Sequence, residues 1–402
     1  MESMDGRESS MMVDRKLAVF GTDAAEAAQV KRMDSYLACG FDVQGFMMRR
    51  ANMNTDFEPF WNNLHLSDVD NENQLGRMWA VAKSIPKVIA NRHLLRGTDI
   101  IVARNLDMLM IAAIAQKLAP TAKPRLIYEC LDINNLMTGT GLKNRLFRWI
   151  ERRLLTQTDT LMVSAPAFVD NYFAPVQGWT GKTVLVENKI WVNNPQELPR
   201  PTVHSVKDRP PISADNPLIL GWIGTLRCQQ SLDLLVAAAQ ALGPNVQIAM
   251  HGVVHYHAVP DFDATIAAHP NLVFHGPYAY PKGLAEVYDS CDLVWSQDMW
   301  QWGTNSTWLL PNRIYEASYF GCPSIAVAGT GTGDRVSAGL GWAIPEPSAD
   351  ALVSFLPSLT ADTLTDMRKT ILARPDSEFL QSAEEIRAAL TATTKTPVPL
   401  TA

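Results

Sequence analysis

A cation and a carboxylate lie three residues apart in the C-terminal half of this chain. They are Arg313 and Glu316, in the stretch LPNRIYEASYFGCPS over 310–324. We expect a helix whose first residue is Pro311, so that Asn312, Arg313 and Glu316 share one side of its first turns. A guanidinium suits phosphate oxygens and a carboxylate suits a sugar diol, so a nucleoside diphosphate fits this surface. The alternative is a surface helix with an ordinary ion pair.

A second candidate phosphate contact follows the apolar run LILGWIG over 218–224, which predicts a buried strand. Gly224 lacks a Cβ and lets backbone approach a ligand closely, and Thr225 follows it. Arg227 stands where the strand should meet the next helix. This pattern is less specific than a full GxGxxG motif. A glycine turn with a solvated arginine is the alternative.

These candidates belong to an alternation of apolar and amphipathic segments, which indicates parallel sheets with right-handed crossovers. The alternation pauses over 194–217, which carries six prolines and reads as a linker or a surface excursion. We expect 50–75 to be loop with short helices. The sequence therefore predicts an α/β protein with two Rossmann-like domains facing a cleft, where ligands lie beyond the carboxyl ends of the strands. The expected divisions are an N-terminal domain over 1–193, a linker over 194–217, a C-terminal domain over 218–375, and a C-terminal helix and tail over 376–402.

The composition is that of a soluble globular protein. The chain has 402 residues, 47% of them hydrophobic, and its net charge of −6 argues against general nucleic-acid binding. Its five cysteines are scattered, as expected of reduced thiols. The polar start MESMDGRESSMMVDRK lacks the apolar segment of a signal peptide, and no apolar run reaches the ~18 residues of a membrane span. We expect a cytoplasmic protein that can touch a membrane surface.

Three motifs in order resemble the C-terminal half of the GT-B nucleotide-sugar glycosyltransferases, and most of all the bacterial exopolysaccharide enzymes of succinoglycan and xanthan assembly. The motifs are Gly-x-x-Gly-Thr-Leu-Arg over 221–227, HPNLVFHGPYAYPKGLAEVYDSCDLVW over 269–295, and LPNRIYEASYFGCPSIAV over 310–327. The resemblance covers 218–345 well, and over 16–190 it lies more in the order of the elements than in the residues.

The resemblance implies that Glu316 holds the ribose hydroxyls and that Arg227 and Arg313 neutralise the diphosphate. Arg313 stands where the family usually has lysine. Gly224 and Thr225 would bring backbone and a hydroxyl to the phosphates. The loop that contains His275 and Tyr278 matches the one that flanks the nucleobase, and His251 is at a further strand end that would face the cleft.

One position departs from the family pattern. Many relatives have a second glutamate eight residues before the one at 316, and here that position is Trp308, in the segment DMWQWGTNSTW. Trp300, Trp302 and Trp308 could shape the donor-sugar pocket by stacking, or could simply pack a loop. The glycine-rich segment 329–335 is expected to be a loop at the end of a strand, which suits contact of Asp334 with sugar hydroxyls; a flexible connection is the alternative.

Activation of an acceptor hydroxyl needs a carboxylate, and the N-terminal domain is the natural source. Asp132 follows the strand-like run RLIYEC, and Asp23 follows KLAVFG. We favour Asp132 as the catalytic base, because it matches an acidic position in similar exopolysaccharide enzymes. A cap or turn role is the alternative for either residue.

The segment LKNRLFRWIERRLL over 142–155 mixes basic side chains with large apolar ones. Such a helix suits docking on an anionic membrane surface, where it would meet a lipid-linked acceptor. The alternative is a core-facing helix with a solvated basic side.

No metal site or cofactor is predicted. The spacing of His251, His255 and His257 matches no standard metal site, and the Asp-x-Asp pairs at 68–70 and 261–263 read as surface pairs. Two guanidinium groups and a helix dipole would cover a leaving diphosphate without a metal.

We therefore predict a glycosyltransferase that moves a hexose from a nucleotide diphosphate donor, UDP-linked, to a lipid-linked oligosaccharide in exopolysaccharide biosynthesis. A nucleotide-sugar epimerase of the same fold and a non-catalytic two-lobed sugar-binding protein are the alternatives. A nicotinamide dehydrogenase is more distant, because FGTDAAEAA after the first strand lacks the later glycines of GxGxxG.

Overall fold

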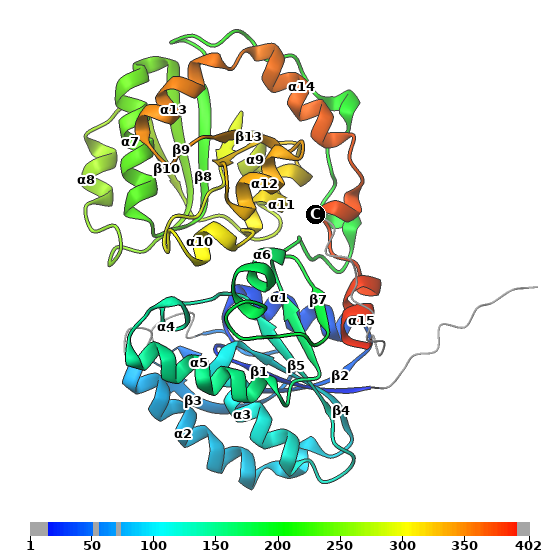
Figure 1. The fold of residues 1–402 in the computed structure, drawn as a ribbon. Helices are drawn as coiled ribbons and strands as arrows, with labels where there is room; N and C mark the ends of the chain where they lie inside the picture. The colour runs from blue at the N-terminus through cyan, green and yellow to red at the C-terminus, as the bar shows by residue number, and fades with distance from the viewer. Residues whose placement is uncertain (1–14, 51–55, 70–73, 392–402) are drawn as a thin grey trace, which may run out of the picture.

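The computed structural model describes residues 15–50, 56–69 and 74–391, and this part of the chain forms two α/β lobes, one above the other (Figure 1). Each lobe is built on a sheet of parallel strands with helices packed against it. The predicted fold class, an α/β protein with two Rossmann-like domains, is confirmed.

The N-terminal lobe contains a seven-stranded sheet in the order β3-β2-β1-β4-β5-β6-β7. Its strands are β1 (Lys16–Gly21), β2 (Asp42–Arg50), β3 (Asn62–Val69), β4 (Thr98–Arg104), β5 (Arg125–Cys130), β6 (Thr160–Val163) and β7 (Thr183–Leu185). Its helices are α1 (Ala27–Ala38), α2 (Gln74–Ala90), α3 (Asn105–Leu118), α4 (Asn135–Thr138), α5 (Leu142–Leu155) and α6 (Pro166–Phe168), which continues into the π-helical turn η2 (Val169–Phe173).

The C-terminal lobe contains a six-stranded sheet in the order β10-β9-β8-β11-β12-β13. Its strands are β8 (Leu218–Leu226), β9 (Val246–Val254), β10 (Leu272–Gly276), β11 (Leu293–Trp295), β12 (Ser324–Val327) and β13 (Gly341–Ile344). Its helices are α7 (Gln229–Leu242), α8 (Phe262–Ala267), α9 (Leu284–Asp289), α10 (Asn305–Trp308), α11 (Asn312–Tyr319), α12 (Gly331–Ser337), α13 (Ala349–Phe355) and α14 (Ala361–Leu372).

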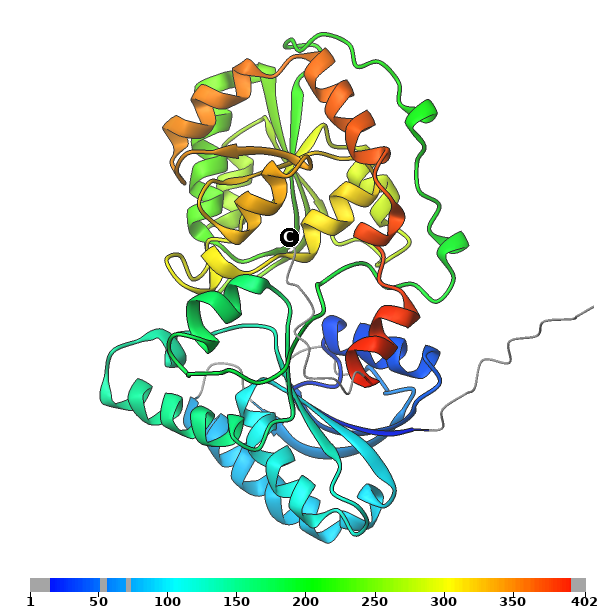
Figure 2. The ribbon, with the colours of Figure 1, turned by 45° about the vertical axis from the view of Figure 1, so that its right-hand side comes forward.

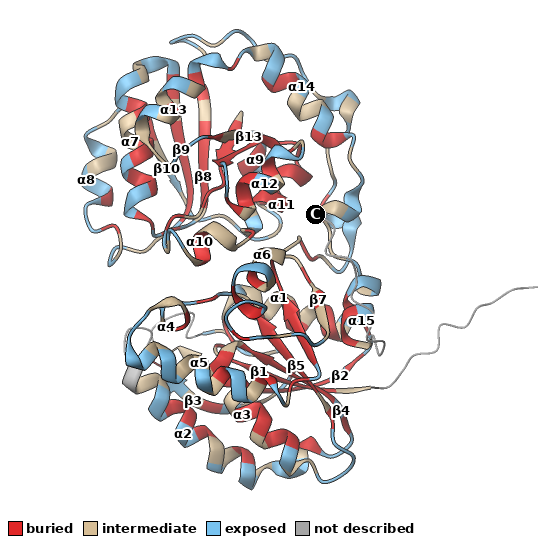
Figure 3. Cartoon of the chain, viewed as in Figure 1, coloured by how far each residue is buried: buried red, intermediate tan, exposed pale blue. Residues whose placement is uncertain are grey.

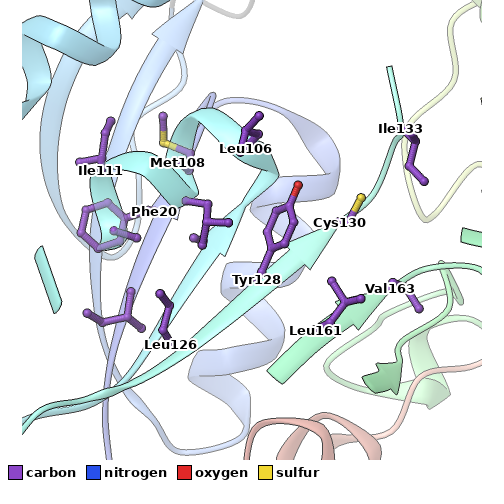
Figure 4. Close-up of a cluster of buried hydrophobic side chains, with 14 of the residues drawn as sticks. Phe20, Leu106, Met108, Ile111, Leu126, Tyr128, Cys130, Ile133, Leu161 and Val163 are labelled. Atoms are coloured by element: carbon purple, nitrogen blue, oxygen red, sulfur yellow. The ribbon is translucent and has the colours of Figure 1, made fainter. Parts of the chain in front are cut away.

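The strands are apolar along most of their length because both faces of each sheet are covered. Figure 3 shows the strands of both lobes as mostly buried. In the N-terminal lobe, Phe20 stacks on Phe46 with 4.7 Å between ring centroids. Figure 4 shows Phe20 of β1, Leu126 of β5 and Leu161 of β6 in one cluster with Met108 and Ile111 of α3. This packing fixes the strand ends from which site residues project.

One strand differs from the sequence expectation. The segment expected to be loop contains β3, which pairs in parallel with β2 at the edge of the sheet. Its sequence, NNLHLSDV, has few apolar residues and most of its side chains are partly exposed, as befits an edge strand. The apolar periodicity was therefore too weak to predict it.

The chain passes between the lobes at two adjacent places. Val186 packs in the N-terminal core, whereas Ile190 already packs against the C-terminal lobe. Ile190 pairs with the segment 379–381, where the chain returns from the C-terminal lobe. The pairing is an isolated β-bridge with N–H···O bonds of 2.9 and 2.8 Å. Helix α15 (Ala383–Thr391) then packs on the N-terminal lobe, where Figure 2 shows it in red beside the blue α1. The C-terminal helix is therefore part of the first lobe's packing.

The proline-rich segment 194–217 lies along the C-terminal lobe. Arg200 donates hydrogen bonds to the carbonyl oxygens of Tyr319 (3.0 Å) and Ile371 (2.9 Å). Arg209 forms an ion pair of 2.6 Å with Asp292. These contacts hold the segment to one lobe, so the passage between lobes lies before it.

Candidate active site

Gly224 and Gly252 pair with each other near the carboxyl ends of β8 and β9. Gly224 has φ of 105° and Gly252 has φ of 137°, conformations that favour glycine. A Cβ at Gly252 would lie 1.7 Å from the carbonyl oxygen of Gly224. A Cβ at Gly224 itself would lie 3.9 Å from the guanidinium of Arg313. The structure thus places the partly exposed backbone of Gly224 beside Arg313, a predicted phosphate ligand, and Thr225 is exposed next to it.

The two predicted phosphate-binding arginines are held differently. Arg313 donates from Nη1 to the carbonyl oxygen of Trp295, at 3.2 Å, at the end of β11. Arg227 remains 46% exposed and forms only a long ion pair, 3.9 Å from Nη2 to Asp298 Oδ2. Its guanidinium lies 6.0 Å from the ring of Trp300. Asp298 is itself fixed by hydrogen bonds from the Ser306 hydroxyl and the Trp300 amide, so it orients Arg227 without burying it.

Glu316 is buried in the middle of α11, where it is 6% exposed. Its Oε2 accepts a hydrogen bond of 2.9 Å from the hydroxyl of Tyr288. Burial raises the pKa of Glu316, while the charges of Lys31 and Arg313 and the bond from Tyr288 lower it. Helix α11 begins at Asn312, with Pro311 at the N-cap position rather than at the first helical position as predicted. Asn312 is exposed there.

Lys31 is a site residue that sequence reasoning missed. It lies on α1 of the N-terminal lobe, and Nζ donates a hydrogen bond of 3.1 Å to the carbonyl oxygen of Lys189. Burial lowers the pKa of Lys31 to about 8, against the opposing effect of the Glu316 charge. Because Lys31 and Glu316 are far apart in the sequence and belong to different lobes, no local pattern could have linked them.

The predicted nucleobase loop lies close to Glu316. Burial, together with the Glu316 charge, raises the pKa of Tyr278, and the nearby Arg313 charge lowers it. His251 stacks on His275, with centroids 4.4 Å apart and planes 7° apart. Burial and the neighbouring His275 lower the pKa of His251 to about 4, so its ring is neutral at physiological pH. The two stacked imidazoles offer a flat surface at the ends of β9 and β10.

Asp132 lies where the N-terminal lobe meets the C-terminal lobe. Its Oδ1 accepts a hydrogen bond of 3.0 Å from Nδ2 of Asn305, and Asn305 Oδ1 accepts one of 2.9 Å from the amide of Ile133. Asp132 is exposed as a whole residue, but protein atoms crowded around its carboxylate raise its pKa by desolvation, while Asn305 and the positive charge of Arg227 lower it. The carboxylate is therefore within electrostatic reach of Arg227, the predicted phosphate ligand. Asn305 belongs to the Trp-rich segment, and no sequence signal indicated its role.

The alternative carboxylate, Asp23, is 2% exposed and interacts with residues of its own lobe. Its Oδ1 accepts a hydrogen bond of 3.1 Å from the amide of Ala25, and Oδ2 lies 3.5 Å from Nε of Arg50. These are the contacts of a turn residue with an ion pair.

Asp334 is exposed on the C-terminal lobe. The segment expected to be a loop forms α12, in which the glycines permit close packing. A Cβ at Gly333 would lie 2.0 Å from the carbonyl oxygen of Val327, and one at Gly331 would lie 2.8 Å from that of Trp308. Within the described ranges, the Asp334 carboxylate makes no hydrogen bond or ion pair. The expected loop is thus a helix, and contact of Asp334 with sugar hydroxyls stays a prediction.

The tryptophans of the Trp-rich segment divide into two kinds. Trp300 and Trp302 are 46% and 38% exposed. Trp308, at the position where relatives have a second glutamate, is partly buried against the N-terminal core. The first two rings are therefore the more accessible to a ligand.

The weaker metal candidates do not converge. His255 and His257 are 5.3 Å apart between ring centroids, whereas His251 is stacked on His275. Asp263 accepts a hydrogen bond of 3.2 Å from the hydroxyl of Tyr256, and Asp70 lies outside the described residues. Across 15–50, 56–69 and 74–391, no group of three or more His, Cys, Asp or Glu could hold a metal ion. All five cysteines are buried and free.

Comparison with known proteins places this geometry in context. No protein-family model matches the chain. The chain is 33% identical over 296 residues to a protein of Rhizobium meliloti (strain 1021) named succinoglycan biosynthesis protein ExoL, and the match covers 73% of this chain and 72% of that protein.

Solved structures share the fold over nearly the whole chain. Anabaena HepE, crystallised in complex with UDP and glucose, has a TM-score of 0.62 and 16% identity, covering 94% of this chain and 99% of that one. WaaG, a glycosyltransferase involved in lipopolysaccharide biosynthesis, has a TM-score of 0.59 and 12% identity, covering 94% and 100%. A Listeria monocytogenes protein described as a UDP-N-acetylglucosamine 2-epimerase has a TM-score of 0.56 and 13% identity, covering 96% and 99%. At these identities the likeness is one of fold.

Proposed function

The chain belongs to the family of the succinoglycan biosynthesis protein ExoL, among the GT-B glycosyltransferases of exopolysaccharide biosynthesis, and from this premise we propose that it moves a sugar from a UDP-linked donor to a lipid-linked oligosaccharide. One observation carries the proposal. Asp132 of the N-terminal lobe accepts a hydrogen bond from Asn305 of the C-terminal lobe and interacts electrostatically with Arg227 of that lobe. Sugar transfer in exopolysaccharide assembly is the role that the family membership supports. We propose the identities of the donor and the acceptor, and the roles of individual residues, in addition to that family role.

The C-terminal lobe offers what a UDP-sugar needs. Arg313 lies against Gly224, where backbone approaches closely, and Arg227 has most of its hydrogen-bonding capacity available to an anion. Guanidinium groups bind phosphate oxygens in pairs of parallel bonds. In this proposal the Glu316 carboxylate, which is electrostatically coupled to Arg313, accepts hydrogen bonds from the ribose hydroxyls, while Tyr278 and the stacked pair of His251 and His275 flank the uracil. HepE shows that UDP and glucose can occupy this fold.

In the proposed reaction, the C-terminal lobe stabilises the leaving diphosphate and the N-terminal lobe supplies the base. As the bond between the sugar and the diphosphate breaks, negative charge grows on the leaving oxygen, and Arg227 and Arg313 stabilise it more than they stabilise the bound donor. Asp132 accepts the proton of the acceptor hydroxyl as the new bond forms, or steadies positive charge on the sugar. Asn305 holds the carboxylate from the opposite lobe, so Asp132 is positioned only when the lobes are together.

The surface of α5 supports docking on a membrane. Its inner side carries the buried Glu151 and Leu155, whereas Leu142, Leu146 and Trp149 are 82%, 54% and 61% exposed. These three lie at helical spacing on one outward stripe, next to the exposed basic side chains Lys143, Arg145 and Arg153. Large apolar groups among cations suit an anionic lipid surface. No helix in the described part of the chain has the length and apolar character to cross a bilayer.

The donor proposal is tested by thermal shift and titration calorimetry with UDP, GDP, ADP and their glucose conjugates. UDP and a UDP-sugar should raise the melting temperature, because they bind the native state alone. Glu316→Gln should weaken UDP, whereas the exposed Glu346→Gln should not. Preference for another nucleotide, or equal UDP affinity in Glu316→Gln, would refute the donor assignment.

The acceptor proposal is tested by following UDP release from the preferred donor with and without a bacterial lipid extract that contains lipid-linked oligosaccharides. Transfer requires that release depends on the extract and that labelled sugar enters the lipid fraction. Conversion of the nucleotide-sugar without any acceptor would instead identify an epimerase of the same fold. Co-sedimentation with phosphatidylglycerol vesicles tests docking: Leu146→Ser with Trp149→Ser should abolish it, and unchanged binding ends that idea.

A further inference from the structure

Lys31 is held at the passage of the chain between the two lobes. It belongs to α1, in the upper part of the N-terminal lobe in Figure 1. Its Nζ donates a hydrogen bond of 3.1 Å to the carbonyl oxygen of Lys189. Nearby along the chain, Glu187 accepts a hydrogen bond of 2.9 Å from the hydroxyl of Tyr315, the neighbour of Glu316 on α11. One short segment of chain thus contacts Lys31 on one side and α11 on the other.

The two oxygens of the Glu316 carboxylate have different surroundings. Oε2 accepts the hydrogen bond of 2.9 Å from the hydroxyl of Tyr288. Tyr288 is buried, and its ring lies nearly parallel to that of Phe320 with 6.1 Å between centroids, so its hydroxyl has a fixed place. Within the described residues Oε1 accepts no hydrogen bond, and it keeps some exposed surface although Glu316 as a whole is buried. The carboxylate is therefore anchored through one oxygen and open to a ligand through the other.

The charge of Glu316 is balanced from both lobes. Burial raises the pKa of Glu316, and the positive charge of Lys31 opposes this shift most strongly. The hydrogen bond from Tyr288 and the charge of Arg313, both in the C-terminal lobe, oppose it less. The main compensating charge for this carboxylate therefore comes from the N-terminal lobe.

A bound donor would increase the need for that charge. Arg313 is a predicted diphosphate ligand, and a diphosphate brings negative charge that favours protonation of a neighbouring carboxylate. Tyr278 and Tyr280 supply no positive charge, and burial and the Glu316 charge raise the pKa of both phenols, so they stay neutral at physiological pH. Lys31, which is not one of the predicted phosphate ligands, is left to compensate Glu316.

Lys31 can supply this charge at neutral pH. The residue is partly exposed, but protein atoms around its ammonium group lower its pKa to about 8 by desolvation, and the Glu316 charge opposes this shift. Arg32 and Arg104 lower the pKa further, although both form ion pairs with Glu129. The effect of Lys31 on Glu316 should therefore be present below about pH 8 and lost above it.

We propose that Lys31 and Tyr288 are positioning residues for donor binding: Tyr288 leaves Oε1 of Glu316 facing the ligand, and Lys31 supplies the opposite charge that keeps this oxygen a strong acceptor. An ionised carboxylate accepts hydrogen bonds about twice as strong as those of a neutral acceptor. This role rests on the proposed function, in which Glu316 binds the ribose hydroxyls. Because Lys31 belongs to the N-terminal lobe, the ribose is bound at full strength only when the lobes are together.

The test compares UDP with 2′,3′-dideoxy-UDP, which lacks the ribose diol, by titration calorimetry on the full-length protein over about pH 5.5–8.5. The wild type should prefer UDP by about tenfold or more. Lys31→Gln keeps a donor for Lys189 but removes the charge, and Lys31→Met removes both. In these variants and in Tyr288→Phe, the preference for UDP should disappear at a pH about one unit higher than in wild type, because Glu316 takes up a proton more readily. Lys117→Gln, exposed on α3, should match wild type.

Unchanged affinity for the dideoxy analogue in the Lys31 variants, with the preference for UDP lost at higher pH, supports the proposal. Two outcomes would overturn it and leave the donor assignment standing. One is that all three variants keep the wild-type preference at every pH. The other is that both Lys31 variants weaken the two nucleotides equally, which would make Lys31 only a structural contact between the lobes. If the wild type binds neither nucleotide, or binds both equally, the donor assignment fails and this role fails with it.

Discussion

The carboxyl ends of the two sheets both carry charged side chains, but the two lobes use them differently. In the N-terminal lobe, Arg32 and Arg104 each pair with Glu129 at 3.0 Å, and all three are nearly wholly buried. In the C-terminal lobe, Arg227 is 46% exposed and its ion pair with Asp298 measures 3.9 Å. The charges of the first set neutralise one another inside the protein, and the second set retains capacity for a ligand.

This difference separates charges that hold the fold from charges that bind. A buried ion pair must stay complete, because removing one partner leaves an uncompensated charge in a medium of low polarity. An exposed guanidinium near backbone amides instead gains when an anion arrives. Asp132 is the exception in the N-terminal lobe, since its hydrogen bond comes from Asn305 of the other lobe. Four substitutions, taken in order of decreasing expected effect, test this distinction.

The largest effect is expected from Asp132→Asn, which keeps the size of the side chain and an oxygen for Asn305 but removes the base. We expect kcat to fall by about 10²–10⁴-fold with little change in stability. In the wild type, kcat/KM should fall as pH drops through the raised pKa of Asp132, because the protonated acid cannot accept a proton. The variant should lack this acid limb. Asp350→Asn, on an exposed position, is the control, and near-normal turnover of Asp132→Asn would remove it from the mechanism.

Glu129→Gln should damage the fold rather than the chemistry. It leaves Arg32 and Arg104 buried without their shared carboxylate, and breaking such a group typically costs about 3–5 kcal/mol. Urea denaturation would measure the free energy of unfolding, with Glu286→Gln on the surface as the matched control. A loss below about 1 kcal/mol would contradict the structural role assigned to these charges.

Arg227→Ala should show the opposite behaviour. We expect transfer to fall by about 10²–10³-fold, in line with the loss of one group that stabilises developing charge, while the urea midpoint stays within error of wild type. Arg96→Ala, also exposed but in the N-terminal lobe, controls for loss of surface charge. If Arg227→Ala instead unfolds the protein while sparing turnover, the distinction between the lobes fails at this residue.

The smallest effect concerns His251. Burial holds its pKa at about 4 in the folded protein, below the ordinary value of 6.5, so the unfolded chain binds more protons between these values. Stability should therefore be fully present above pH 6.5 and decline as pH falls toward 4. We expect His251→Asn to remove about 1–2 kcal/mol of the loss between pH 7 and 5. Denaturation at both pH values measures it, with the exposed His204→Asn as control; an identical pH dependence in both variants would contradict it.

Much of the architecture could be predicted because it rests on local patterns. The alternation of apolar and amphipathic segments predicted the strands and helices of both lobes, since a parallel sheet covered on both faces needs apolar strands. The edge strand β3 was not predicted, because a polar, half-exposed strand lacks the apolar run that identifies a buried one. The glycines of 329–335 indicated a loop, yet they begin α12, where their missing side chains admit neighbouring carbonyl groups.

The candidate site divides in the same way. Arg313 and Glu316 share one helix, and Gly224 and Arg227 share one strand end. Their proximity could therefore be predicted from residue spacing, because helix and strand geometry fix it. Three other contacts became visible only in the folded chain. Lys31 lies near Glu316, Asn305 donates a hydrogen bond to Asp132, and Glu129 forms ion pairs with two arginines. These contacts join residues separated by many elements, and they depend on how two lobes and the returning C-terminal helix pack, which no local spacing encodes.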